Sequence, residues 1–414
     1  MISTRLRVGR LGQNTLLSTG GLVIRALIQA AYLILLSRWM QPHGYGLFAG
    51  SVAAATLISP LSGWGISYVY TQWVARDPSS SRSLWATALL QIALSGVMLV
   101  FVLMLASVTV LGTRMDLRSM LIVGLAELIA LPVALTASRA CMALDRGASS
   151  ALIMILVPGF RLLVALVFLA LGAAGKPANI ATFHFAGSVL GMLVAIYLMT
   201  RFDGAPAWRT RMPIREATRE GSGYAVGSLV GVSYPEVDKV LLLQIVGAVA
   251  TGNYTVAFRA ISVLVLPISA LAGAALPRLF AAHGGVTWPK LFKSMTGAAV
   301  GYGFVAVIAA VLLAPLIPHI FGASYAVSSK YLLLLSPWPV FFALHQSFAA
   351  ALTASGKQVA RVVVEATGLV LILALNLLLL RSMGVNGAVL ALLITEVFMM
   401  LGCWLLVWRR RVMT

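Results

Sequence analysis

Long apolar segments alternate with short polar ones along the chain. Each apolar segment is about 20 residues or longer, the length that an α-helix needs to cross the ~30 Å hydrocarbon core of a bilayer. The pattern predicts about twelve membrane-spanning helices, at residues 14–38, 45–73, 83–111, 119–142, 150–174, 179–200, 221–246, 252–281, 293–321, 329–354, 360–381 and 386–408. The connections between them are short, so we expect an all-α polytopic membrane protein with no room for a soluble domain.

The charge distribution orients these predicted helices. The chain is 60% hydrophobic and 10% charged, and its 30 Lys and Arg against 11 Asp and Glu give a formal net charge of +19. Such a balance is compatible with nucleic-acid binding. With both chain ends on one side of the membrane, however, about 20 basic residues fall on that side and about six on the other, as the positive-inside rule describes. The asymmetry predicts cytoplasmic termini and no nucleic-acid partner.

The two halves of the sequence show a weak internal repeat. Gly46–Phe48, at the start of the second predicted helix, corresponds to Gly252–Tyr254, at the start of the eighth, with an offset of 206. Parallel repeats of this kind occur in several transporter folds. We therefore predict an N-terminal six-helix lobe at residues 1–205, a cytoplasmic linker at 206–220 and a C-terminal six-helix lobe at 221–414.

No sequence pattern points to bond-making chemistry. There is no phosphate-binding Gly-rich loop followed by lysine, no nucleophile set and no metal-ligand spacing. Cys141 and Cys403 lie in or beside predicted helices, which does not favour a structural disulfide. We predict that the protein is not an enzyme and that it has no catalytic residue, metal or cofactor.

Two arginines lie deep within predicted helices. Arg25 is separated from the flanking Arg10 and Arg38 by roughly 20 Å of helix, too far to reach either interface. An arginine at this depth costs about 2.5–3.5 kcal/mol on insertion scales, so it must face protein, water or a ligand. Arg161 follows Pro158-Gly159, a pair that is expected to bend its helix.

The remaining intramembrane charges suggest ion coupling or helix pairing. Glu127 and Glu396 have no charged neighbour on their own helices, and a buried carboxylate can carry a proton. Both are candidates for H⁺ or Na⁺ coupling; the alternatives are pairing with an intramembrane arginine or hydrogen bonding to a neighbouring helix. Lys239 and Arg259 lie near Glu236 and Asp238, which predicts structural ion pairs or a salt-bridged gate, with Asp238 as a third coupling candidate.

Several segments resemble one family of transporters. "LLSRWMQPHGYGLF" at residues 35–48 resembles the first-loop signature of bacterial polysaccharide flippases, and "EVDKVLLLQIVGAVATGNYTVAFRA" at 236–260 resembles its second-half counterpart. "AALTASGKQVAR" and "GVNGAVLALLITEVF" are also similar to segments of that family. The chain is identified as a member of the O-antigen and exopolysaccharide translocases of the multidrug/oligosaccharidyl-lipid/polysaccharide exporter superfamily.

The resemblance implies a fold and a cargo. The fold is V-shaped, with two six-helix lobes that give alternating access. The cargo is an oligosaccharide on undecaprenyl diphosphate, moved from the cytoplasmic to the periplasmic leaflet of the bacterial inner membrane. Because guanidinium groups grip phosphate oxygens, Arg25 and Arg161 are the first candidates for cargo binding, followed by Arg259 and Lys239. The implied partners are this lipid-linked cargo, membrane lipid, a polysaccharide polymerase and a chain-length regulator.

Three other functions compete with this interpretation. A multidrug or toxin extruder of the same superfamily would favour an acidic cavity for cationic drugs, whereas this chain has two intramembrane arginines. A lipid II flippase typically has more helices than the predicted twelve. A membrane glycosyltransferase or polymerase usually has a large outer loop, and the outer loops predicted here are short.

Overall fold

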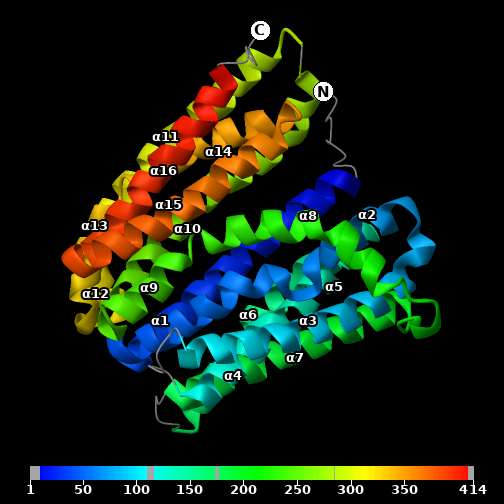
Figure 1. Ribbon diagram of the computed structural model, residues 1–414, viewed down its shortest axis with the longest axis horizontal. Coiled ribbons are helices and arrows are strands. Elements are labelled where there is room, and N and C mark those ends of the chain that lie inside the picture. The colour runs from blue at the N-terminus through cyan, green and yellow to red at the C-terminus, as the bar shows by residue number, and fades with distance from the viewer. Residues whose placement is uncertain (1–9, 110–115, 173–176, 284, 409–414) are drawn as a thin grey trace, which may run out of the picture. The chain divides into compact units, whose positions relative to one another are not determined.

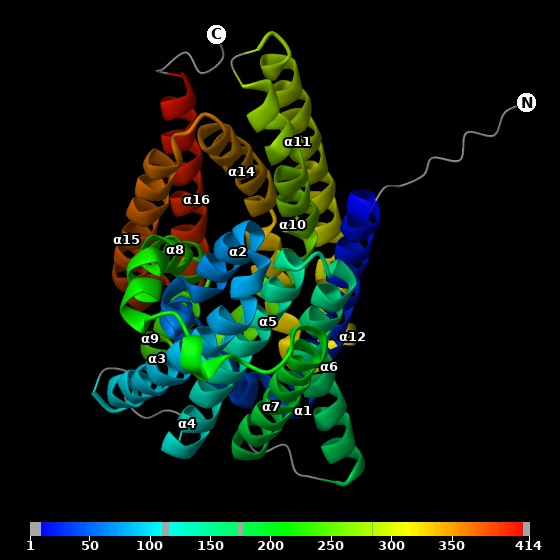
Figure 2. The ribbon, with the colours of Figure 1, turned by 90° about the vertical axis from the view of Figure 1, so that its right-hand side faces the viewer.

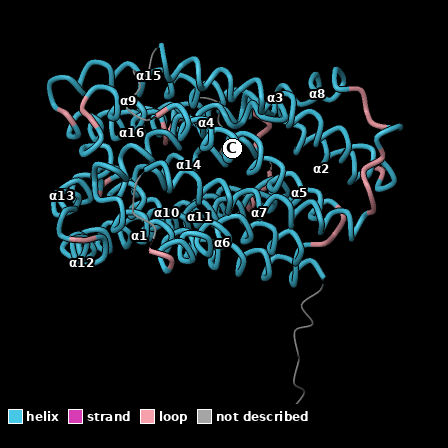
Figure 3. The backbone as a smooth tube through the Cα atoms, turned by 90° about the horizontal axis from the view of Figure 1, so that it is seen from below, coloured by secondary structure: helices cyan, strands magenta, loops and turns pink. Residues whose placement is uncertain are grey.

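The structure is a computed structural model that describes residues 10–109, 116–172, 177–283 and 285–408. The first half of the chain contains the helices α1 (Arg10–Ile58), α2 (Ile66–Arg76), α3 (Ser81–Thr109), α4 (Leu117–Leu125), α5 (Leu131–Ala143), α6 (Gly147–Ala170) and α7 (Pro177–Asp203). The second half contains α8 (Ile214–Ser233), α9 (Val237–Ile245), α10 (Ala248–Ala282), α11 (Trp288–Leu313), α12 (Ile317–Phe321), α13 (Ala326–Leu335), α14 (Trp338–Ala354), α15 (Gln358–Met383) and α16 (Val385–Trp408). No strand occurs in the described ranges, and the loops are short (Figures 1 and 3). The protein is an all-α membrane protein, as the sequence predicts.

The number of membrane spans depends on how broken helices are counted. Nine helical segments within the described residues are long and apolar enough to cross a membrane, or up to ten if the bent pair Ala323–Leu335 and Trp338–Ala354 is one span. One segment, Val23–Arg76, combines the first two predicted helices. The predicted helix at 221–246 falls on α8 and α9, which a break after Ser233 separates. Twelve spans therefore remain a prediction.

The described residues form two compact units. The first unit contains the described residues up to Leu36 together with Ala54–Leu229, and the second contains Ser37–Ala53 together with Val230 onward. The long helix α1 therefore contributes to both units. The lobe boundaries predicted at 205–206 and 220–221 remain a prediction.

In the first unit, breaks in helices let polar groups and close contacts occur within the bundle. After α1, the 3₁₀ segment η1 (Ser59–Gly65) has Gly63 and Gly65 in left-handed conformations, with φ of 71° and 79°. A Cβ on Gly65 would lie 2.3 Å from the carbonyl oxygen of Gly221 on α8, so only glycine allows this approach. Between α4 and α5, the π-helical turn η3 (Ala126–Ala130) inserts one extra residue into the helical path.

In the second unit, α10 and α11 run side by side, as do α15 and α16 (Figure 2). Residues 37–53 of α1 join this unit after a kink at Gln41, which has φ 56° and precedes Pro42. Polar contacts tie this segment to the region around α12: the Nε of Arg38 donates to the carbonyl of Ile320 at 2.7 Å, and the Tyr325 hydroxyl donates to the carbonyl of Ser37 at 3.0 Å.

The same segment meets α10 through two reciprocal glycine contacts. A Cβ on Gly46 would lie 1.8 Å from the carbonyl oxygen of Ala248, and a Cβ on Gly252 would lie 2.1 Å from the carbonyl oxygen of Pro42. Pro42 and Ala248 are separated by 206 residues, the same offset that relates Gly46 to Gly252. The contact is thus made by corresponding positions of the sequence repeat. Gly46 packs on Ala248, the counterpart of Pro42, and Gly252 packs on Pro42 itself.

Candidate functional site

The first unit buries a cluster of charged side chains from three helical segments. Glu127 lies in the π-helical turn η3, and its Oε1 accepts a hydrogen bond from the Nη2 of Arg161 on α6 at 2.7 Å. The same oxygen lies 2.6 Å from the Nε2 of His184 on α7. Gly187 allows α7 to approach closely here, since a Cβ at this position would lie 2.5 Å from the Cα of Arg161. The cluster therefore depends on both the π turn and this glycine.

Further hydrogen bonds fix the orientation of the cluster. The Nε of Arg161 donates to the hydroxyl of Ser188 at 2.8 Å, and the Nδ1 of His184 lies 3.0 Å from the hydroxyl of Tyr32 on α1. Both ring nitrogens of His184 consequently have polar partners. Glu127, at 3% exposure, is satisfied by a guanidinium and an imidazole together.

Arg25 is the unbalanced charge of the first unit. Its side chain on α1 is half-buried, and its Nη1 lies 3.8 Å from the sulfur of Met154. It forms no ion pair with any carboxylate whose position the structure describes, and the positive charge of Arg161 acts on it repulsively. Two guanidinium groups are thus set against the single carboxylate of Glu127, which leaves an excess of positive charge in this part of the unit.

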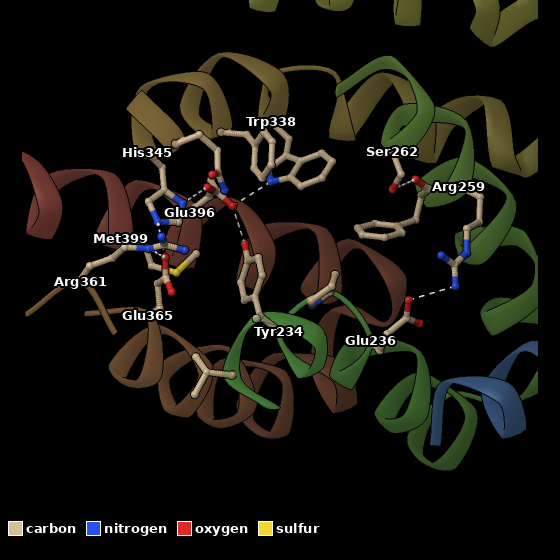
Figure 4. Close-up of a pocket in the computed structure, with 16 residues that line it drawn as sticks. Tyr234, Glu236, Arg259, Ser262, Trp338, His345, Arg361, Glu365, Glu396 and Met399 are labelled. Carbon is tan, nitrogen blue, oxygen red and sulfur yellow. Dashed lines mark hydrogen bonds and ion pairs between the residues drawn. The ribbon is translucent and has the colours of Figure 1, made fainter. Parts of the chain in front are cut away.

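The second unit contains a cavity of about 340 Å³ (Figure 4). Aromatic side chains and charged groups share its wall: the lining includes Tyr234, Glu236, Phe258, Arg259, Trp338, Phe342, His345, Arg361, Glu365, Glu396 and Met399. A volume of this size accommodates a small ligand or several water molecules.

Glu396 on α16 is the centre of one hydrogen-bonded network in this cavity. Its Oε2 accepts from the hydroxyl of Tyr234 at 2.7 Å and from the indole Nε1 of Trp338 at 3.0 Å, while its Oε1 lies 2.7 Å from the Nδ1 of His345. Figure 4 shows these three side chains pointing toward Glu396. The carboxylate is fully buried, and three donors replace the water that it loses.

An ion pair on α15 lies next to this network. The Nε of Arg361 donates to the Oε1 of Glu365 at 2.7 Å, and its Nη1 donates to the hydroxyl of Thr353 at 3.2 Å. The Oε1 of Glu365 lies 3.9 Å from the Nε2 of His345, which connects the pair to the Glu396 network.

A second group of ion pairs occupies the other side of the cavity. The Nη2 of Arg259 on α10 lies 3.0 Å from the Oε1 of Glu236. Lys239 on α9 is fully buried: its Nζ lies 3.4 Å from Glu236, 3.3 Å from Asp238 and 3.8 Å from the ring centre of Phe258. Asp238 also accepts a hydrogen bond from the hydroxyl of Tyr254.

The sequence candidates fall into two separate sets. Arg25, Arg161 and Glu127 belong to the first unit, and the second unit holds Lys239, Arg259, Asp238 and Glu396. Glu127 pairs with Arg161, one of the alternatives that the sequence left open, and Lys239 and Arg259 form ion pairs with their neighbouring acids. Whether these groups bind cargo or a coupling ion remains a prediction.

Two histidines are more closely involved than the sequence suggested. His184 and His345 lie in predicted helices, where interhelical hydrogen bonding is the usual role of such residues. Each contacts a buried glutamate from another helix, His184 with Glu127 and His345 with Glu396. The signal available in the sequence was the presence of histidine and glutamate within the predicted helices of each half.

The fold is that of multi-pass membrane transporters. The chain is similar to an inward-facing multidrug resistance MATE family transporter of the MOP superfamily, with a TM-score of 0.79 and 15% identity over 94% of this chain and 98% of that one. An outward-facing MATE family transporter matches with a TM-score of 0.65 and 16% identity over 99% and 97% of the two chains.

The chain belongs to the family described as polysaccharide biosynthesis proteins, whose family model matches residues 11–283. A MOP superfamily transporter from Pyrococcus furiosus, noted for the reverse polarity of its binding pocket, also matches, with a TM-score of 0.66 and 14% identity over 98% and 95% of the two chains. No curated protein matches the sequence. The resemblance to polysaccharide flippases of this superfamily is confirmed, and the protein is a transporter and not an enzyme.

Proposed function

We propose that the protein moves oligosaccharide repeat units, carried on undecaprenyl diphosphate, from the cytoplasmic to the periplasmic leaflet of the bacterial inner membrane by alternating access. The observation that carries this proposal is the excess positive charge of the first unit, where Arg25 and Arg161 are set against Glu127 alone. An anionic diphosphate would balance that excess, because guanidinium groups bind phosphate oxygens with directed hydrogen bonds. A cationic drug would increase the repulsion instead.

The proposal also names the partners, the orientation in the membrane and the residues that could couple transport to an ion. The expected partners are the lipid-linked cargo, membrane lipid, a polysaccharide polymerase and a chain-length regulator, and both termini are expected in the cytoplasm. Glu127, Glu396 and Asp238 are the candidates for H⁺ or Na⁺ coupling. Arg259 and Lys239 are the secondary cargo candidates, although their ion pairs with Glu236 already neutralise part of their charge.

Complementation of a strain that lacks its own repeat-unit flippase tests this function. The strain should come from the same organism, so that the native cargo is present. Wild type is expected to restore surface polysaccharide, whereas Arg25→Ala and Arg161→Ala are expected to reduce it at least about tenfold, since each loses a charged contact worth more than about 1.4 kcal/mol. Arg25→Lys keeps the charge and should retain part of the activity.

Arg381→Ala provides a matched control, because Arg381 is an exposed arginine on α15 outside both clusters. Membrane levels of every variant should be measured alongside export. If wild type and both alanine variants restore export equally, the assignment of cargo binding to the two arginines is wrong. If wild type does not restore export but lowers drug accumulation in a sensitive strain, the extruder function replaces the flippase.

A further inference from the structure

The two buried histidines each contact a buried glutamate but have different surroundings. In the first unit, His184 on α7 contacts Glu127 with one ring nitrogen and the hydroxyl of Tyr32 with the other. In the second unit, His345 on α14 contacts Glu396 through Nδ1, but its Nε2 makes no hydrogen bond with any described residue. The His345 side chain is only 5% exposed and lines the cavity (Figure 4). An unpartnered ring nitrogen in such a place is costly unless something binds to it.

The tautomer of His345 follows from its partner. The carboxylate of Glu396 is an acceptor, so the Nδ1 of His345 carries the hydrogen, and Nε2 then holds a lone pair when the ring is neutral. The oxygens of Glu396 already accept hydrogen bonds from Tyr234 and Trp338. The nitrogen of this network that remains open to a proton is therefore the Nε2 of His345.

The charge balance of the cavity also favours a proton on the Nε2 of His345. The lining contains three carboxylates, those of Glu236, Glu365 and Glu396, but only two guanidinium groups, those of Arg259 and Arg361. Lys239 and Asp238, which lie beside Glu236, add one charge of each sign and leave this balance unchanged. With neutral His345 the wall has one negative charge in excess, and a protonated His345 removes it. The new N–H would point toward the Oε1 of Glu365, which lies 3.9 Å from Nε2. In the first unit the excess is positive, so a proton on His184 would increase the repulsion.

The His345 ring is surrounded by titratable and charged groups of both signs: Tyr234 on α8, Glu236 before α9, Arg259 on α10, Arg361 and Glu365 on α15, and Glu396 and Cys403 on α16. The two arginines oppose a proton on the ring, but each is paired with a glutamate, Arg259 with Glu236 and Arg361 with Glu365, whereas Glu396 contacts the ring directly. The helix α11 also packs against α14 but contributes no residue to the described cavity lining.

We infer that the second unit binds the coupling cation as a proton on the Nε2 of His345. The inference rests on the proposed flippase function, because it names the ion that drives that transport. A hydronium ion of the water that enters the cavity gives its proton to the Nε2 lone pair and becomes water, which leaves an imidazolium between Glu396 and Glu365. The reverse step returns the proton to water and restores the neutral ring. The carboxylate of Glu396 positions the ring through its contact with Nδ1.

Solid-state NMR of the full-length protein in lipid nanodiscs, labelled with ¹⁵N-histidine, reads this proton directly. The chain has five histidines, and the signals of His345 are identified as those missing from His345→Asn. Asparagine keeps a donor near the position of Nδ1 but has no second nitrogen to titrate. If that variant does not fold, the signals are assigned by replacing the other four histidines one at a time.

The expected result is that the Nε2 signal of His345 changes from unprotonated to protonated as the pH falls from about 11 to about 5, a range that includes histidines whose pKa neighbouring carboxylates raise by several units. The signals of His184, the buried histidine of the first unit, should keep one state over this range. The inference is overturned if the Nε2 signal of His345 keeps one state throughout. It is also overturned if the signal responds to sodium at constant pH, which would identify a metal cation as the ligand.

Export measurements separate this inference from the proposed function. If wild type restores surface polysaccharide and His345→Asn does not, although its membrane level is normal, the proton site is required for transport. If both restore export equally, the coupling role of His345 is wrong and the flippase function stands. If wild type does not restore export, the flippase function fails, and the NMR titration still decides whether His345 binds a proton.

Discussion

Glu127 is the single side chain on which most of the first cluster depends. It is buried and accepts from both Arg161 and His184, so its removal would leave a guanidinium and an imidazole without their acceptor. Breaking a buried ion pair on one side is far more costly than replacing both partners with apolar groups, because the remaining charge stays buried. A comparison of single and double variants can therefore separate a loss of stability from a loss of transport.

We expect Glu127→Gln to destabilise the protein by about 3–5 kcal/mol, the range for an uncompensated buried charge. Adding Arg161→Met should recover much of this loss, but the double variant should still fail to export, since it lacks one of the two cationic groups. Thermal unfolding in detergent and surface polysaccharide in the complemented strain measure the two effects. Recovery of export in the double variant would show that Arg161 serves only to pair with Glu127.

The sequence identified the buried charges but not their partners. The apolar surroundings of Arg25, Arg161, Glu127 and Glu396 are visible in the sequence, because a charge within a long apolar segment stands out. The open nitrogen of His345 was not visible, since it depends on the rotation of α14 relative to α16. Sequence spacing places residues along a helix but not the helix against its neighbours.

At the scale of helices, glycines and breaks determine how closely segments pack. The reciprocal contacts of Gly46 with Ala248 and of Gly252 with Pro42 bring two backbones together without any side chain between them. Close backbone approach through small residues is a main source of helix association in membranes, where burial of apolar side chains gives little advantage over lipid.

We expect Gly46→Ala and Gly252→Ala each to destabilise the second unit by about 1–3 kcal/mol, the usual cost of overpacking, because the added methyl group meets a backbone carbonyl that cannot rotate away. Gly231→Ala and Gly297→Ala are the matched controls, since a Cβ at either helical position meets nothing within 4 Å. The controls should be neutral or stabilising by up to about 1 kcal/mol. Thermal unfolding of the purified variants measures all four, and equal stability of the two pairs would contradict the contact.

The sequence predicts where one helix break lies, but it does not predict the backbone geometry of the breaks. The break near Pro42 separates the first two predicted helices, and the structure has its kink at Gln41. The π-helical turn at Ala126–Ala130 contains no proline or glycine itself, but Gly124 and Pro132 flank it, and it packs against α3 and α7. A flanking proline marks a place where the helical hydrogen bonds change, but it does not specify a π turn in the sequence.

For the whole molecule, the distribution of charge predicts how the chain is oriented in the membrane. About 20 of the 30 basic residues fall on the side of the two termini when the chain has an even number of spans. Translocation of a basic segment against the membrane potential is unfavourable, so this side is expected to stay in the cytoplasm.

Reporter fusions measure this orientation. Alkaline phosphatase, which is active only in the periplasm, should be inactive when fused to the C-terminus and active when inserted at Gly322, between α12 and α13. A fluorescent protein that matures only in the cytoplasm should show the opposite pattern. An active phosphatase at the C-terminus would mean an odd number of spans or an inverted chain.

The division of α1 between the two units has a consequence for biosynthesis. The ribosome makes residues 37–53 before any other part of the second unit, yet their polar partners, Ile320 and Tyr325, follow more than 250 residues later. During this interval the glycine face around Gly46 has no α10 to pack against. Residues 37–53 must therefore wait for the rest of the second unit to be made. If the chain were cut within the predicted linker, the first fragment would still contain residues 37–53, which belong to the second unit. Co-expressed halves would have to exchange this piece correctly before either could be fully assembled.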